Sequence, residues 1–245
     1  MWGRRRVEYI ADCFCGNVRD NNEDNFYCNG VTLPMIHKDL EQFVRGAAWT
    51  TEDPLFAICD GMGGEACGEA ASFTGVEAIG AERRKVADLT SMIQKMNRNI
   101  YEQAQNNGIE FMGSTAAILK MKRGKVLGAN IGDSSVFLFR DGELKKLTVD
   151  HVTEKHAWRK GELTQYLGVG ENEMILEPHL FQVKCRQGDY YLMCTDGVTD
   201  MLGQSEIAGI IRESISLEQI ISVLKKRIYE AGAKDNTTMI CCRID

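Results

Sequence analysis

The sequence lacks the features that mark linkers, secreted proteins and membrane spans. Only three prolines occur in 245 residues, and no Gly/Ser linker, low-complexity tract or internal repeat interrupts the chain. No run of about eighteen apolar residues is present. The basic start has neither the apolar centre nor the cleavage site of a signal peptide. We therefore expect one domain, residues 1–245, in the cytoplasm and not in a membrane.

An excess of positive charge is also missing. The 29 Lys and Arg and the 35 Asp and Glu leave a formal net charge of −6. General nucleic-acid binding needs a basic face to meet the phosphate backbone, so this balance excludes it. We expect a monomer with no nucleic-acid partner.

Cysteine is plentiful, but a disulfide framework is not indicated. The nine cysteines are odd in number, and most lie in apolar stretches such as LFAICDG and MICCRID. Such residues read as reduced thiols in a core. Cys13 and Cys15 could share one face of a strand, yet no second pair accompanies them, which disfavours a structural zinc site.

Strands in runs, separated by pairs of helices, predict an α+β fold. Regular alternation of strands and helices is absent, so a parallel sheet is excluded. We expect a β-sandwich of two antiparallel sheets with helix pairs on its outer faces, and an antiparallel meander over residues 113–148. The expected helices cover residues 65–84, 88–105, 205–214 and 217–232, and strands are expected near 7–15, 25–30, 55–61, 114–122, 125–132, 134–148, 181–185, 189–195 and 237–244.

Five short acidic motifs lie where a strand is expected to end and a turn to begin. One Asp-Gly pair is usually only a turn. Five together indicate more, because a carboxylate next to a buried apolar strand, as at Asp60, is costly unless it is paired or metal-bound. Such an oxygen-rich cluster suits Mg²⁺ or Mn²⁺. The motifs are Arg19-x-x-Asn22-Glu23-Asp24, Asp60-Gly61-Met62-Gly63-Gly64, Gly132-Asp133-Ser134, Thr195-Asp196-Gly197-x-x-Asp200 and Lys234-Asp235-Asn236-Thr237.

Eight segments, in order between Gly16 and Thr238, resemble the signatures of the protein phosphatase 2C or PPM-type family, in particular its compact bacterial branch. They are RDNNED, CDGMGG, GST, GANIGDSS, LTVDH, LTQYLG, CTDGVTD and KDNTT. The resemblance implies a metal-dependent hydrolase that removes phosphate from phosphoserine and phosphothreonine in proteins, opposing a serine/threonine kinase. Its fold would be two antiparallel sheets flanked by helices.

The resemblance also implies a role for each motif residue. Asp60 would bridge two Mg²⁺ or Mn²⁺ ions, with the Gly61 carbonyl on one of them. The remaining carboxylates would divide among the ions: Asp196 and Asp235 on the first, Glu23 and Asp24 on the second directly or through waters, and Asp133 with Asp196 and Asp200 on a possible third.

Arg19 matches the arginine that binds the phosphate in that family. Its planar fork suits two phosphoryl oxygens at once. Two cations about 4 Å apart can generate hydroxide near neutral pH and stabilise an in-line displacement, so no side-chain nucleophile is needed. The competing enzyme class, cysteine-dependent phosphatases, requires a CxxxxxR loop. Cys13 to Arg19 approaches that spacing, but Gly16 is its only glycine, and Asp20 follows the arginine.

Two positions depart from the eukaryotic pattern or are ambiguous. Met62 replaces a histidine proposed as general acid in eukaryotic members, so a metal-bound water would protonate the leaving alcohol. His151 lies in a family motif, but we expect it to make a structural hydrogen bond at a helix start. No function is expected of His37, His156 or His179.

Two segments differ in length or pattern. The flap between Leu147 and Leu163 is short, reduced to one helix over residues 151–160, which predicts an open rim with weak sequence selection. Trp158, Arg159 and Lys160 could form a partial groove for an acidic or phosphorylated segment, or only a solvated helix end. Residues 31–51 are expected to form a surface loop, with a contact to a partner as the alternative.

Two alternative functions remain open at this point. The same site could hydrolyse small phosphomonoesters, because metals and Arg19 contact only the phosphate. A pseudophosphatase, a binding or regulatory module without metals, is disfavoured because Asp60, Asp196 and Asp235 are all present.

Overall fold

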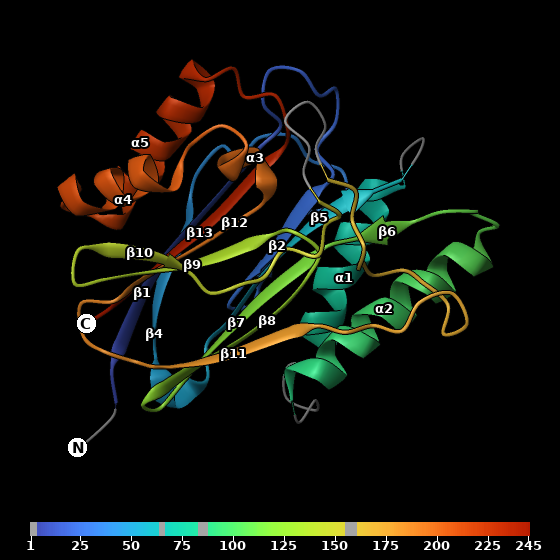
Figure 1. Cartoon of the computed structure of the whole chain (residues 1–245), viewed down its shortest axis with the longest axis horizontal. Helices are drawn as coiled ribbons and strands as arrows, with labels where there is room; N and C mark the ends of the chain where they lie inside the picture. The colour runs from blue at the N-terminus through green and yellow to red at the C-terminus, as the bar shows by residue number, and fades with distance from the viewer. Residues whose placement is uncertain (1–3, 64–66, 83–87, 155–160) are drawn as a thin grey trace.

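Two antiparallel β-sheets pack face to face in the computed structural model of the chain (Figure 1). The structure describes residues 4–63, 67–82, 88–154 and 161–245. The first sheet has the strand order β10-β9-β12-β13-β1-β4, and the second has the order β11-β8-β7-β5-β2-β3, with β6 paired to β5. The strands are β1 (Arg6–Phe14), β2 (Asp24–Cys28), β3 (Val31–Thr32), β4 (Val44–Trp49), β5 (Leu55–Met62), β6 (Gly113–Ser114), β7 (Ala116–Lys122), β8 (Lys125–Ile131), β9 (Ser135–Arg140), β10 (Glu143–Lys146), β11 (His179–Lys184), β12 (Tyr190–Cys194) and β13 (Thr237–Ile244).

Pairs of helices cover the outer faces of both sheets, as Figure 1 shows. Side-chain caps begin two of them, because Asp88 accepts from Ser91 N at 2.8 Å and Ser216 accepts from Gln219 N at 3.1 Å. These caps confirm two of the helix starts expected from the sequence to within one residue. The helical elements are α1 (Gly68–Glu82), α2 (Leu89–Asn106), α3 (Asp196–Thr199), α4 (Gln204–Glu213), α5 (Leu217–Glu230) and a 3₁₀ turn, η1 (Thr50–Glu52). None of the helices in the described ranges is long and apolar enough to span a bilayer.

Three apolar layers hold the sandwich together. The central layer lies between the sheets and includes Phe26, Phe56 and Tyr191. The other two layers lie under α4 and α5 and under α1 and α2. All nine cysteines are free thiols, and eight of them are buried. Burial raises the pKa of the Cys194 thiol to about 12. The expectation that most of the cysteines lie in the core is confirmed.

The expected meander over residues 113–148 is wrong at one point. β7 and β8 pair in the second sheet, whereas β9 and β10 pair in the first, so the chain changes sheets between Ile131 and Ser135. Gly132 makes this change with φ +89°, and a Cβ there would lie 2.6 Å from the Thr115 side chain. The crossing leaves Asp133 between the two sheets at their common edge.

Part of the expected surface loop 31–51 is a strand. β4 pairs with β1 at the edge of the first sheet, from Arg6 opposite Trp49 to Ala11 opposite Val44. Its sequence, VRGAAW, has no clear apolar alternation, so only the partner strand makes it recognisable. The short helix α3 was also not expected from the sequence.

The shortened flap does not begin with a helix at His151. Residues 151–154 instead lie beside residues 162–164, where Thr153 N donates to Glu162 O at 2.8 Å and Thr164 N donates to His151 O at 2.9 Å. The imidazole of His151 accepts from Gly132 N at 3.1 Å, a structural hydrogen bond as expected. The rest of the expected helix, with Trp158, Arg159 and Lys160, lies outside the described residues.

Candidate active site

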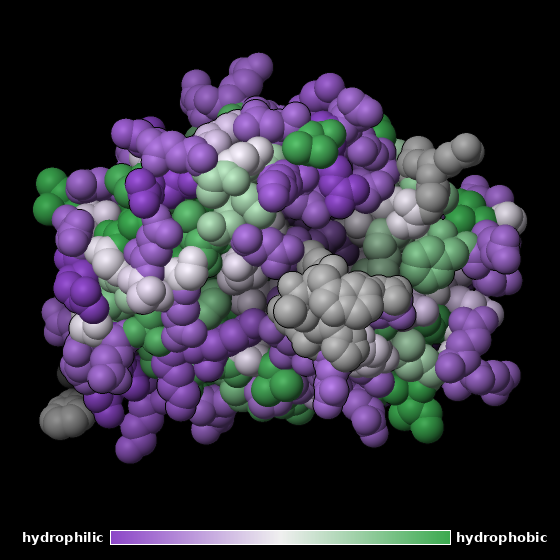
Figure 2. Space-filling model, turned by 45° about the horizontal axis from the view of Figure 1, so that its top comes forward, coloured by the Kyte–Doolittle hydropathy of each residue, from purple (hydrophilic) through white to green (hydrophobic). Residues whose placement is uncertain are grey.

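Segments that are far apart in sequence meet at one edge of the sandwich around a cavity of about 280 Å³. This edge lies at the top of Figure 1, near α3 and the end of β5. Figure 2 shows it as a hollow with hydrophilic residues along its upper side. The described lining residues are Arg19, Glu23, Asp60, Gly61, Met62, Gly63, Thr115, Asp133, Gly161, Leu163, Asp196, Asp235 and Asn236.

Asp60 lies near the end of β5, where the buried strand reaches the cavity. Its carbonyl accepts from Thr115 N at 2.8 Å and from Ser114 Oγ at 3.0 Å, and its own N–H donates to Thr115 Oγ1 at 3.2 Å. Both backbone polar groups of Asp60 are therefore bonded to residues 114 and 115. Burial, followed by the neighbouring carboxylates of Asp24 and Asp196, raises the pKa of Asp60 well above its usual value.

Gly61 is required for close packing beside this carboxylate. Its N–H donates to Glu23 O at 3.0 Å. A Cβ on Gly61 would lie 2.0 Å from Gly68 O at the start of α1, a contact that no side chain tolerates. The Asp-Gly pair is therefore fixed between β2 and α1 and is more than a turn.

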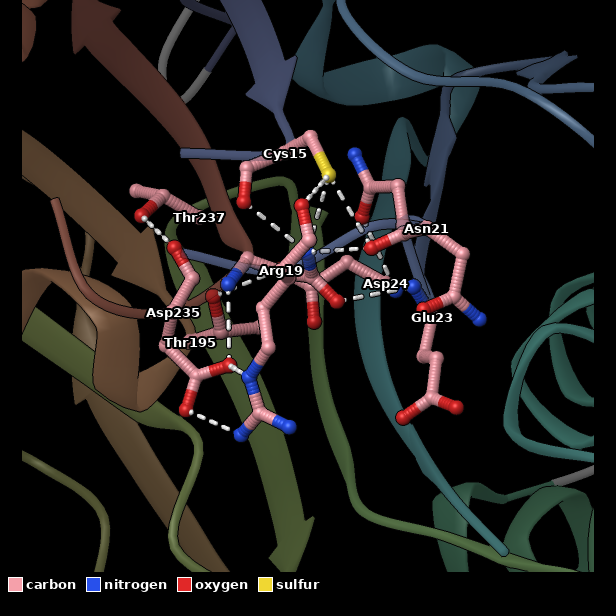
Figure 3. Close-up of polar contacts among 10 residues, drawn as sticks. Cys15, Arg19, Asn21, Glu23, Asp24, Thr195, Asp235 and Thr237 are labelled. Atoms are coloured by element: carbon pink, nitrogen blue, oxygen red, sulfur yellow. Dashed lines mark hydrogen bonds and ion pairs between the residues drawn. The ribbon is translucent and has the colours of Figure 1, made fainter. Parts of the chain in front are cut away.

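Arg19 and Asp235 both line the cavity and contact each other directly (Figure 3). Arg19 Nε lies 2.9 Å from Asp235 Oδ1, and Nη2 lies 2.9 Å from Oδ2. This is a bidentate pair in which both nitrogens of the fork meet one carboxylate. The arginine side chain is half-exposed, so its fork is accessible from solvent.

Glu23 and Asp24 are adjacent in sequence, but the structure separates them. Glu23 lines the cavity, and burial followed by Glu69 raises its pKa. Asp24, the first residue of β2, lies beneath the cavity, where its Oδ2 accepts from Thr195 Oγ1 at 2.8 Å. Burial raises the pKa of Asp24 to about 8. Asp24 is thus not among the lining residues.

The two remaining aspartates of the cavity lie where the chain turns sharply. Asp133 occupies the crossing between the sheets, and Asp196 is the first residue of α3. Gly197 follows Asp196 and packs so closely that a Cβ would lie 2.1 Å from Asn236 O. Asp200, at the other end of α3, is exposed and is not among the described lining residues.

Asn236 and Thr115 are site residues to which the sequence analysis gave no role. The amide of Asn236 donates to Asn21 O at 2.8 Å and to Cys15 O at 3.0 Å, while its oxygen accepts from Glu23 N at 2.9 Å. It therefore ties the segment that carries Arg19 and Glu23 to the one that carries Asp235. Thr115 does the same for Asp60 and the Asp133 turn, since its Oγ1 lies 2.8 Å from Ser134 Oγ. Both residues lie inside the quoted motifs GST and KDNTT, which was the available signal.

The lining fits hard divalent cations by its chemistry. Five of its described side chains are acidic, and Arg19 is the only arginine or lysine among them. Repulsion among such carboxylates favours a cation or a proton between them. Among the residues that the structure describes, no three Asp, Glu, Cys or His side chains lie close enough together to bind one metal ion as they stand. Asp235 instead contacts Arg19.

Comparison with known proteins assigns the family. A family model described as stage II sporulation protein E (SpoIIE) matches residues 51–245. The chain belongs to this family of PPM-type phosphatases. The serine/threonine phosphatase stp of Listeria welshimeri is 28% identical over 250 residues, covering 92% of this chain and 91% of that protein. The protein phosphatase PhpP of Streptococcus pneumoniae is 28% identical over 247 residues, covering 91% and 92%.

Solved structures of PPM-type phosphatases share the fold. The serine/threonine phosphatase PstP/Ppp of Mycobacterium tuberculosis superposes with a TM-score of 0.79 at 26% identity, covering 97% of this chain and 98% of that one. The catalytic domain of the phosphatase PstP, solved in complex with two manganese ions, superposes with a TM-score of 0.77 at 27% identity, covering 98% and 99%. These likenesses confirm the expected α+β sandwich.

The close approach at Gly197 gives a stability test of this part of the PPM-type site. In Gly197→Ala the methyl group would press on Asn236 O and Thr237 Oγ1, so we expect the free energy of unfolding to fall by about 1–3 kcal/mol or more. Gly209→Ala is the matched control. Gly209 lies within α4 with nothing within 4 Å of a Cβ, and alanine should raise the free energy of unfolding there by about 0.5–1 kcal/mol. Urea unfolding measures both, and equal effects would contradict the packing described for Gly197.

Proposed function

We propose that residues 1–245 form one metal-dependent phosphatase domain that hydrolyses phosphoserine and phosphothreonine in proteins and so reverses the action of a serine/threonine kinase. The observation that carries this proposal is the meeting of Glu23, Asp60, Asp133, Asp196 and Asp235 with Arg19 in one cavity. The family supports it, and the manganese complex of a related phosphatase supports the choice of metal.

The carboxylates would hold two Mn²⁺ or Mg²⁺ ions. Asp60 has Asp133, Asp196 and Asp235 as electrostatic neighbours and is the residue we assign to both ions. Asp196 and Asp235 would complete one ion site, and Glu23 with the Gly61 backbone would serve the other. Asp24 is buried and would serve the same ion as Glu23 through bound water. Asp133 with Asp196 is the pair available for a third ion. When bound, such ions supply a water of lowered pKa and stabilise negative charge on the phosphoryl oxygens.

Arg19 is the residue we assign to the phosphate. Its fork already meets a carboxylate in the two-point geometry that a phosphoryl group would use. It would hold two phosphoryl oxygens in place and offset the charge that develops on them, which is the main contribution a protein makes to phosphoryl transfer. Met62, which also lines the cavity, has no proton to donate.

Loss of the shared carboxylate tests the metal site. In Asp60→Asn, hydrolysis of p-nitrophenyl phosphate with added Mn²⁺ should fall below one tenth of the wild-type rate, because both proposed ions lose a charged ligand. Asp141→Asn, at the exposed turn between β9 and β10, is the control and should keep wild-type activity. EDTA should abolish the wild-type activity, and Mn²⁺ should restore it. Retention of more than a tenth of the activity in Asp60→Asn would exclude this assignment, and no activity in the wild type would leave only a binding module.

Loss of Arg19 tests the phosphate contact separately from the metals. Arg19→Ala should lower kcat/KM about ten- to a thousandfold, equivalent to about 1.4–4 kcal/mol of charge-assisted hydrogen bonding, and Arg19→Lys should recover only part of it. Calorimetric Mn²⁺ affinity should stay equal or increase, because Asp235 loses its competing partner. Weaker Mn²⁺ binding in Arg19→Ala would show instead that the arginine is structural.

A further inference from the structure

Three side chains form an apolar shelf beside the catalytic cavity: Met62, Phe111 and Tyr166. The rings of Phe111 and Tyr166 meet edge to face, with centroids 5.7 Å apart and planes at 78°. Met62 and Tyr166 close over Gly113, since a Cβ on that glycine would lie 3.2 Å from Met62 Cγ and 3.3 Å from Tyr166 Cδ2. Phe111 is 44% exposed, which is unusual for a large aromatic side chain.

The backbone fixes this shelf to the catalytic strand. β6 pairs with the end of β5, with Met62 opposite Gly113 and Gly61 opposite Ser114. On its other side, Ser114 exchanges two hydrogen bonds with Leu167, of 3.1 and 2.8 Å. Ser114 also donates its hydroxyl to Asp60 O. The shelf and the proposed metal ligand are therefore held in one rigid arrangement.

The shelf is continuous with the cavity. Met62 and Gly63 line the cavity and Leu163 adds a further apolar side chain. Figure 2 shows the hydrophilic hollow with apolar residues to its right. None of the three shelf side chains carries a charge, so the shelf offers no ion pair to a second phosphate or to a basic group.

A phosphorylated peptide must pass over this rim. An extended chain advances about 3.3–3.6 Å per residue, and its neighbouring side chains point to opposite faces. Because Met62 belongs both to the cavity lining and to the shelf, a side chain within about two residues of a phosphoresidue bound in the cavity would reach the shelf. An apolar side chain there would remove both its own surface and that of Phe111 from water.

We propose that the apolar shelf binds a hydrophobic side chain that flanks the phosphoserine or phosphothreonine of the substrate. This inference rests on the proposed phosphatase activity. It makes Met62, Phe111 and Tyr166 determinants of specificity at a rim that the sequence suggested would be weakly selective.

Phosphothreonine peptides that differ at a single position test the proposal. The reference peptide has serine at the two positions before and the two positions after the phosphothreonine. Each of four further peptides replaces one of these serines with leucine. The wild type should show a kcat/KM about tenfold higher for a peptide with leucine at the shelf position, the lower end of what one apolar pocket contributes. In Phe111→Ser that preference should fall to about twofold. Ile175 is an exposed apolar residue that is not part of the shelf, so Ile175→Ser is the control. In this variant the leucine preference should remain about tenfold.

The outcomes separate this inference from the function on which it rests. If the wild type hydrolyses neither p-nitrophenyl phosphate nor any peptide with Mn²⁺, the proposed function itself fails. If it hydrolyses p-nitrophenyl phosphate and all peptides within twofold of one another, the phosphatase assignment stands and the shelf proposal is overturned. An unchanged leucine preference in Phe111→Ser overturns the shelf proposal too. Hydrolysis of p-nitrophenyl phosphate without hydrolysis of any peptide overturns both the proposed action on phosphoproteins and the shelf proposal.

Discussion

Repulsion among carboxylates that are partly withdrawn from water is the constraint on which the site depends. Asp60 has Asp24, Asp133, Asp196 and Asp235 as electrostatic neighbours, and each disfavours its charged form. Such a cluster opposes folding unless protons or cations offset it. The sandwich nevertheless holds these groups together. They lie at or near the ends of strands, and the pairing of those strands fixes their positions.

Neutral hydrogen-bonding side chains do much of this holding. Asn236 joins the segments of Arg19, Glu23 and Asp235, and Thr115 joins those of Asp60 and Asp133. Because neither side chain carries charge, each can be buried beneath the cavity without adding to the repulsion there. Gly61 and Gly197 complete the arrangement by allowing backbone segments to approach where any side chain would collide. The precision of the site thus depends on Asn236 and Thr115, whose side chains we do not expect to touch an ion, and on the absence of a side chain at Gly61 and Gly197.

The sequence predicted the parts of the structure that local chemistry determines. The apolar run ending at Asp60 pointed to a strand that delivers a carboxylate, and the observed cavity contains that residue. Glu23 directly precedes β2 and Asp24 begins it, and only Glu23 lines the cavity. The sequence predicts this strand only from Asn25 onward, so it gives no reason to separate the two carboxylates. The predicted meander is wrong at Gly132 because β9 pairs with β12, a strand distant in sequence, and so lies in the other sheet. β4 and the apolar shelf could not be predicted either, since both depend on register between segments distant in sequence, including Phe111 against Tyr166.

The central claim is that this carboxylate cluster is a binding site for divalent cations. The most direct test is the free energy of urea unfolding measured over a range of Mn²⁺ concentrations. Cations bound only by the folded chain stabilise it, by about 2.7 kcal/mol for each site at a free concentration of one hundred times its dissociation constant. The account predicts a rise in the free energy of unfolding with Mn²⁺ that is largely lost in Asp60→Asn. A free energy of unfolding that does not change with Mn²⁺, or that rises equally in Asp60→Asn, would contradict it.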